Sequence, residues 1–350
     1  MILGGKKHLI GLDIGSSFVK AAEVKISSKG NVLKKFGMAK IPYGAIAEDR
    51  IVDMDGVAEV IRTLLKTHKI REKNVAISTG GHSVVIKTIN TSKQPENELH
   101  KTIYSEAEQY IPYDIDDVNI DYQILGGSEF SPEQMNVLLV AVKKDLVAEY
   151  IELIQTAGLN PKIIDVDTFA LQNIYEALPH REPEEIAMLV DVGASKTSLN
   201  ILKGTNSIMM RDNVSGTNQI VEGLSSRLEI SVQDAENMLA QGNGEEGDLI
   251  REISADISNT WCSEICEVIN AFQNNTNEEK LGKILLSGGG SLVKGFAENL
   301  QSEVDARVAV LDPFGGLVLD SKKFPDSFIT KVGPQAPIAL GLALRRVDDK

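Results

Sequence analysis

The sequence predicts a two-lobed α/β fold that holds a nucleotide between its lobes. An apolar strand runs directly into the sequence Asp-Ile-Gly-Ser-Ser at 13–17. Much later in the chain, a second apolar strand runs into Asp-Val-Gly-Ala-Ser-Lys-Thr at 191–197. A third strand ends in three consecutive glycines at 288–290. The repeat of a strand, an Asp-x-Gly turn and hydroxyl side chains predicts one phosphate-binding hairpin in each of two lobes.

Both Asp-x-Gly turns contain the residue types that a phosphate site needs. Glycine lets the backbone approach phosphate oxygens, and main-chain N–H groups and hydroxyls donate hydrogen bonds to them. An aspartate at a strand end orients the water shell of Mg²⁺, which keeps several waters when bound. Lysine adds a point charge on the phosphates. The predicted phosphate-binding residues are Asp13, Gly15, Ser16, Ser17, Lys20, Asp191, Gly193, Ser195 and Thr197, and Asp13 and Asp191 are the predicted magnesium residues.

One such turn alone would more often be an ordinary tight turn, so the third strand matters. Bare backbone at Gly288, Gly289 and Gly290 leaves room for a flat ligand or a phosphate. No Gly-x-x-x-x-Gly-Lys-Ser/Thr sequence occurs, and no Gly-x-Gly-x-x-Gly opens a helix after the first strand. These sequences mark P-loop and nicotinamide-binding sites, and their absence argues against both classes.

Charge and hydropathy restrict the partners. The 350 residues include 36 basic and 50 acidic side chains, a formal net charge of −14. This balance argues against binding to nucleic acid, which needs a basic surface, and against direct binding to anionic lipid. No apolar run approaches the roughly 18 residues of a membrane helix, and no signal peptide is recognisable. We therefore expect a cytoplasmic protein that reaches a membrane only through partners.

Periodicity predicts the elements of the first lobe and of a module inserted in it. For the lobe it predicts strands near 8–13, 17–26, 31–41 and 74–78 and a helix at 56–68. For the module it predicts strands at 84–89, 118–124 and 137–142 and helices at 96–110 and 144–157. The expected division is a first lobe at 1–180 with the module at about 84–160, a second lobe at 186–335, and a C-terminal helix at 336–350 that returns to the first lobe.

The order of the two Asp-Gly hairpins and the triple-glycine strand end resembles the actin, sugar-kinase and chaperone ATPase superfamily. Within it, the chain is similar to the PilM family, the actin-like cytoplasmic proteins of type IV pilus machines. The closer match lies in the segments 12–17, 106–115, 138–144 and 339–345. The resemblance implies a bilobal actin-like fold, related to ribonuclease H, with an inserted α/β subdomain in the first lobe.

The resemblance also implies further site residues for ATP and Mg²⁺. Residues 163–171 resemble the helix between the lobes, where the superfamily keeps a residue near the attacking water. Asp165 is the first candidate and Asp167 the second, and the alternative is that both only cap the helix. Glu236 corresponds to a glutamate that contacts the ribose, and 288–290 borders the purine. The lysine that packs on adenine in relatives has no counterpart in the positions after Glu236.

The implied function is an ATP-binding scaffold for type IV pilus biogenesis and twitching motility, at most a slow ATPase. In the family it binds the N-terminal cytoplasmic peptide of the membrane protein PilN, in a ring at the inner membrane with other platform and motor components. One alternative is a membrane-recruited relative of FtsA or of the type II secretion actin-like proteins. A small-molecule kinase is another, although no catalytic aspartate stands out beyond the hairpin acids.

Overall fold

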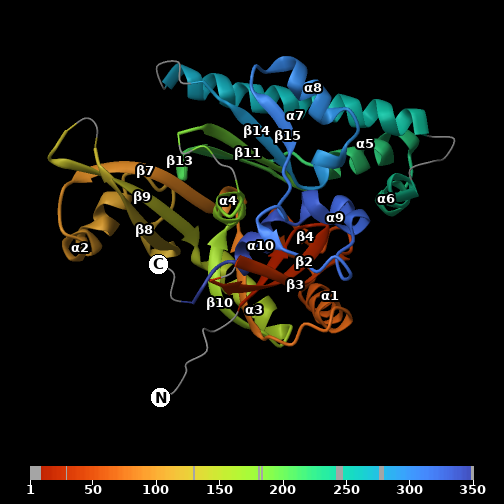
Figure 1. The fold of residues 1–350 in the computed structure, drawn as a ribbon, viewed down its shortest axis with the longest axis horizontal. Helices are drawn as coiled ribbons and strands as arrows, with labels where there is room; N and C mark the ends of the chain where they lie inside the picture. The colour runs from red at the N-terminus through yellow and green to blue at the C-terminus, as the bar shows by residue number, and fades with distance from the viewer. Residues whose placement is uncertain are drawn as a thin grey trace.

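The fold has two lobes, each built on its own sheet, and a smaller module beside them (Figure 1). A computed structural model describes residues 9–28, 30–128, 131–179, 182, 184–241, 247–275 and 280–347. The ends of the predicted division, 1–8 and 348–350, lie outside these residues. No helix in the described part of the chain is long and apolar enough to span a membrane.

The first lobe is a six-stranded sheet in the order β10-β6-β1-β2-β3-β16. Its strands are β1 (Ile10–Ile14), β2 (Phe18–Ser27), β3 (Gly30–Lys40), β6 (Asn74–Thr79), β10 (Asn160–Val166) and β16 (Leu317–Val318). Successive side chains of a strand point to opposite faces of the sheet, and helices cover both faces here. Its two faces pack against α1 (Met54–Thr67) with α3 (Lys144–Thr156), and against α4 (Asp167–Glu176) with α10 (Pro337–Ala343).

The second lobe repeats the start of this topology. Its sheet has the order β13-β12-β11-β14-β15, from β11 (Ile186–Val192), β12 (Thr197–Lys203), β13 (Asn206–Asn213), β14 (Lys283–Ser287) and β15 (Arg307–Val310). In both lobes the first strand pairs antiparallel with the second and parallel with a later one. The covering helices are α5 (Asn218–Leu228), α6 (Val232–Gln241), α7 (Gly247–Asn275) and α8 (Phe296–Glu303), and α9 (Asp326–Val332) packs toward the first lobe. Trp261 of α7 is fully buried against Phe296.

A third sheet forms the module on the left of Figure 1. Its order is β7-β9-β8, from β7 (Val84–Ser92), β8 (Val118–Gly127) and β9 (Gln134–Lys143), and α2 (Glu96–Ala107) packs on it around Leu99 and Ile103. Helix α3 falls inside the predicted module range of 84–160. Its buried side chains, including Tyr150 and Leu153, nevertheless pack in the core of the first sheet.

One boundary differs from the sequence analysis in a way that matters for the site. Residues 163–171 resemble a connecting helix, yet β10 continues to Val166 and α4 begins only at Asp167. The reason is parallel pairing with β6, which extends to Val166 opposite Thr79. Asp165 is therefore a strand residue and Asp167 the first residue of a helix.

Helix α10 lies closely against the first lobe through two glycines. A Cβ atom on Gly11 of β1 would overlap the backbone of Ala339 in α10. A Cβ atom on Gly341 would overlap the carbonyl of Ala170 in α4. Every residue from Pro337 to Ala343 is buried, so this contact ties the end of the described chain to the first sheet.

We predict that Gly341→Ala destabilises the protein by about 1–3 kcal/mol or more, the usual cost of inserting a methyl group into a packed core. Gly127→Ala is the matched control, because a Cβ atom there meets nothing within 4 Å. The measurement is the free energy of unfolding from urea denaturation. Equal values for the two variants would contradict the close contact between α10 and α4.

Candidate functional site

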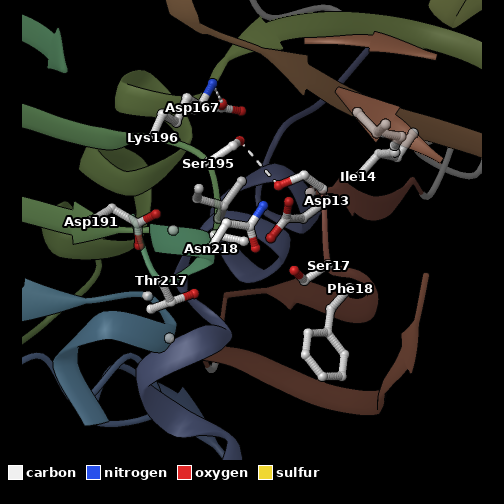
Figure 2. A pocket seen from close by; sticks show the side chains of 18 of the residues that line it. Asp13, Ile14, Ser17, Phe18, Asp167, Asp191, Ser195, Lys196, Thr217 and Asn218 are labelled. Atoms are coloured by element: carbon white, nitrogen blue, oxygen red, sulfur yellow. Dashed lines mark hydrogen bonds and ion pairs between the residues drawn. The ribbon is translucent and has the colours of Figure 1, made fainter. Parts of the chain in front are cut away.

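The ends of β1, β11 and β14 meet at a cavity between the lobes. The cavity has a volume of about 320 Å³ and is lined by residues from both lobes. This volume falls near the lower end of the roughly 300–1,000 Å³ typical of small-molecule sites. Figure 2 shows Asp13 and Ser17 on one side of it and Asp191 and Thr217 on the other.

The two hairpins have the same turn. In the first, the Gly15 N–H donates to the Phe18 carbonyl at 3.1 Å, and in the second the Gly193 N–H donates to the Lys196 carbonyl at 2.8 Å. The turns face each other, since the Ser16 hydroxyl donates to the Ser195 hydroxyl across the lobes at 3.0 Å. The repeat recognised in the sequence is therefore a repeat of backbone geometry.

Asp13 and Lys20 form an ion pair in the first hairpin. They are opposite each other in the β1–β2 ladder, and the lysine Nζ lies 2.9 Å from Asp13 Oδ2. Burial raises the pKa of Asp13, an effect that the Lys20 ammonium opposes. Burial lowers the pKa of Lys20, but Asp13 and two further carboxylates outweigh it, so the net shift is upward. Lys20 is thus held as a cation beside the cavity.

Asp191 is the equivalent carboxylate of the second lobe. It accepts a hydrogen bond from the Ser287 hydroxyl at 2.6 Å. Burial raises the pKa of Asp191 to about 6, while the Ser287 hydrogen bond and the charge of Lys20 act in the opposite direction. Among the residues that the structure describes, none forms an ion pair with Asp191, so a cation in the cavity would stabilise its charged form.

A second lysine, Lys196, crosses from the second lobe to the first. Its Nζ lies 2.6 Å from Asp167 Oδ2 and 4.0 Å from Asp49 Oδ1. Asp167 also accepts from the Ser78 hydroxyl at 2.5 Å. Burial raises the pKa of Asp167, but Lys196 and Ser78 together hold it below its usual value. This pair also lines the cavity (Figure 2).

The cavity is also lined by exposed backbone at two glycines and by a second ion pair between the lobes. Gly288 has a φ of 80°, where a side chain would overlap the backbone of Val192. Next to it, a Cβ atom on Gly289 would meet nothing within 4 Å. Lys40 of β3 lies 2.9 Å from Glu236 of α6. Glu236 thus has a lysine partner from the first lobe.

Most of the predicted site residues line the cavity: Asp13, Gly15, Ser16, Ser17, Lys20, Asp167, Asp191, Gly193, Ser195, Glu236, Gly288 and Gly289. Thr197, Gly290 and Asp165 are not among its described lining residues. The Thr197 hydroxyl is buried and donates to the Ser215 carbonyl. Gly290 packs against Val192 and Trp261.

Asp165, the first candidate for the residue near the attacking water, lies outside the described lining of the cavity. It is buried in β10, accepts from the Val166 N–H at 2.8 Å, and pairs with Arg345 at 3.3 Å. Asp167 takes its place as the candidate. Capping does not explain Asp167, because Val166 is the N-cap of α4 and no side chain caps that helix.

Sequence reasoning missed several lining residues, including Lys40, Asp49, Gly80, Lys196, Thr217 and Asn218. Lys196 had a signal, since it follows Ser195 directly in the second hairpin. Thr217 and Asn218 begin α5, and their N–H groups donate to the carbonyls of Gly193 and Ala194. Nothing local marks Lys40, Asp49 or Gly80, because they reach the cavity only through the packing of the lobes.

The residues present fit a magnesium–nucleotide ligand. Serine hydroxyls and a charged lysine face the cavity as donors, and two carboxylates stand on opposite walls where they could accept from the waters of one cation.

We predict that Asp191 makes folding pH-dependent. Its folded-state pKa is raised from 3.8 to about 6, so its contribution to stability is fully present below about pH 4 and is lost as the pH rises through about 6. Relative to Asp191→Asn, the free energy of unfolding of the unliganded protein should fall by about 1 kcal/mol between about pH 5 and pH 7. Asp305→Asn, at an exposed site, is the control. Parallel pH profiles for wild type and Asp191→Asn would contradict the raised pKa.

Comparisons with known proteins agree on one family. A family model described as type IV pilus assembly protein PilM matches residues 11–347. The solved structure of a PilM-PilN type IV pilus biogenesis complex is similar at a TM-score of 0.87 and 26% identity, covering 99% of this chain and 100% of that chain. The ethanolamine utilization protein EutJ from Carboxydothermus hydrogenoformans is similar in fold alone, at a TM-score of 0.57 and 12% identity over 97% of this chain and 90% of that chain.

The predicted two-lobed actin-like fold and the predicted family are confirmed by these matches. The family match extends across both lobes and the inserted module. The chain belongs to the family of the type IV pilus assembly protein PilM.

Proposed function

We propose that this chain is an ATP-binding, actin-like scaffold of the type IV pilus assembly machine that binds the N-terminal cytoplasmic peptide of PilN. The observation that supports ATP binding best is the cavity lined by the two matching hairpins, one from each lobe. The similarity to a PilM-PilN complex over the whole chain supports PilN as the partner.

In this proposal the hairpins hold the phosphates. The N–H groups and hydroxyls at 15–17 and 193–195 donate to phosphate oxygens, and Lys20 adds its charge. Asp13 and Asp191 orient the waters of Mg²⁺, which when bound neutralises phosphate charge. Lys40 and Glu236 would contact the nucleoside, and the exposed backbone of Gly288 and Gly289 would border it. Asp167 is the candidate that faces the attacking water, and turnover is slow at most.

The nucleotide would stabilise the closed arrangement of the lobes. Polar contacts already join them, such as Ser16 with Ser195, Lys40 with Glu236, and the Tyr43 hydroxyl with Glu222 at 3.0 Å. A ligand that touches both hairpins favours the closed form by mass action, without turnover. We propose that ATP occupancy thereby strengthens PilN binding, and that the module of β7, β8, β9 and α2 forms part of the peptide site.

The proposal places the protein in the cytoplasm, at the inner membrane through PilN and without nucleic acid. It includes a ring of several copies, contacts with other platform and motor components, and a role in twitching motility. A scaffold related to FtsA or to the type II secretion actin-like proteins stays the alternative. No observation at the cavity specifically favours a small-molecule kinase.

We predict that Asp13→Ala reduces the ability of Mg²⁺ to strengthen ATP binding by about tenfold, the size of one lost contact to a charged group. The measurement is the dissociation constant of ATP with and without Mg²⁺, by calorimetric titration. Without Mg²⁺ the variant should bind ATP no more weakly than wild type, because the Asp13 carboxylate no longer competes with the phosphates for Lys20. An unchanged Mg²⁺ effect would remove Asp13 from the magnesium site.

We predict that a synthetic peptide with the N-terminal sequence of PilN binds saturably, and more tightly with Mg-ATP than without it. Asp13→Ala should lose most of this nucleotide effect while it still binds the peptide weakly. Asp305→Asn, at an exposed residue outside the described lining of the cavity, should behave as wild type. Tight ATP binding with no affinity for the peptide would overturn the scaffold proposal and leave the nucleotide site standing.

A further inference from the structure

The ion pair between Lys196 and Asp167 joins the lobes in the lining of the cavity. Lys196 belongs to the second hairpin, and Asp167 begins α4 of the first lobe. Both side chains line the cavity, and they lie 2.6 Å apart (Figure 2). Nothing in the proposed nucleotide site uses this lysine.

Both oxygens of Asp167 are occupied. Oδ1 accepts from the Ser78 hydroxyl at 2.5 Å, and Oδ2 accepts from Lys196. The side chain is 14% exposed, so little solvent reaches it. Each charge-assisted hydrogen bond fixes the orientation of the carboxylate and withdraws electron density from it. Asp167 is thereby a poor acceptor for a further proton.

Lys196 is itself held by the surrounding chain. Asp49, which has a positive φ of 62°, places its carboxylate 4.0 Å from the lysine Nζ. Gly80 leaves the space that the pair occupies, because a Cβ atom there would overlap Lys196 Nζ and approach Asp167 Oδ2. Burial lowers the pKa of Lys196, but Asp167, Asp49 and Asp212 outweigh it, so the lysine stays charged.

Hydrolysis of a bound ATP would need a proton acceptor in the cavity. A water oxygen bonds to the terminal phosphorus while the bond from that phosphorus to the bridging oxygen breaks, giving ADP and phosphate. The proton of the water must move to an acceptor, and positioned acceptors contribute about 10²–10⁴-fold to such rates. Asp167 is a lining carboxylate outside the proposed magnesium pair, and Lys196 competes with water for it.

We propose that Lys196 restrains hydrolysis by holding Asp167 in an ion pair across the lobes, so that the site retains ATP instead of cleaving it. The inference rests on the proposed function, in which the cavity binds ATP. Lys196 is a positioning residue here, because it acts on the phosphate chemistry through Asp167. The same contact stabilises the closed lobes, which links a slow turnover to a long-lived scaffold.

The first test compares ATP hydrolysis by wild type, Lys196→Met and the double variant Lys196→Met with Asp167→Asn. Freed from the lysine, Asp167 should raise single-turnover hydrolysis by about tenfold or more. The double variant should return to the wild-type rate. Tyr43→Phe, which removes a hydrogen bond between the lobes outside the cavity, should leave the rate unchanged. A rate that stays flat or falls in Lys196→Met, or that stays high in the double variant, would overturn the inference.

Gly80→Ala provides a second variant that keeps the lysine. Its methyl group would overlap both Lys196 Nζ and Asp167 Oδ2 and so separate the two charges, and its backbone conformation, φ −159° and ψ −161°, is open to any residue. The hydrolysis rate should rise in this variant too. It therefore tests the inference independently if Lys196→Met folds poorly. No rise in folded Gly80→Ala, as judged by circular dichroism, would count against the inference.

Two measurements without turnover separate the inference from its alternatives. In the absence of nucleotide, Lys196→Met should lower the melting temperature more than the double variant does, because it leaves Asp167 buried beside Asp49 without its cation. In binding, the ratio of the dissociation constants of ADP and of a non-hydrolysable ATP analogue should differ by less than about threefold between Lys196→Met and wild type. A much larger selective loss for the analogue would mean that Lys196 binds the terminal phosphate and would overturn the restraint. Failure of wild type to bind ATP would instead overturn the proposed function itself.

Discussion

The arrangement of the two lobes depends on the pairing of buried charges at their interface. The described lining of the cavity includes five carboxylates, Asp13, Asp49, Asp167, Asp191 and Glu236, and three lysines, Lys20, Lys40 and Lys196. Burying a charge costs free energy unless the charge is paired. Removing one member of a buried pair leaves the other charge without compensation for its lost hydration. Lys20 pairs within its own lobe, whereas Lys196 has its partner only when the lobes are closed. The second hairpin therefore positions the lobes as well as lining the site.

This constraint explains why a scaffold can use a nucleotide without consuming it. The described lining has two more carboxylates than lysines, and a hydrated cation brought with a nucleotide would compensate the charge at Asp191. The same event adds hydrogen bonds to both hairpins, so binding strengthens a closure that the polar contacts have already begun. Rapid hydrolysis would undo the closure, and the ion pair at Asp167 opposes it. The packing of α10 through Gly11 and Gly341 supplies the rigid first lobe against which the second lobe closes.

The sequence was sufficient for features that are local in the chain. Strand, Asp-x-Gly turn and strand form one continuous hairpin, so its position and most of its lining residues could be predicted for both lobes. The choice between Asp165 and Asp167 could not be made locally, because it depends on how far β10 pairs with β6. Thr197 follows the hairpin residues in sequence, yet it is directed to Ser215. Lys40 and Gly80 were beyond sequence reasoning, since packing between distant segments alone brings them to Glu236 and Lys196.

The most direct measurement of the central claim is a crystal structure with Mg²⁺ and a non-hydrolysable ATP analogue. The account predicts phosphates in contact with the N–H groups of both hairpins, at 15–17 and 193–195, and one hydrated cation between Asp13 and Asp191. It also predicts that Lys196 remains on Asp167. Phosphates that touch only one hairpin, or a nucleotide bound outside the cavity between the lobes, would contradict it.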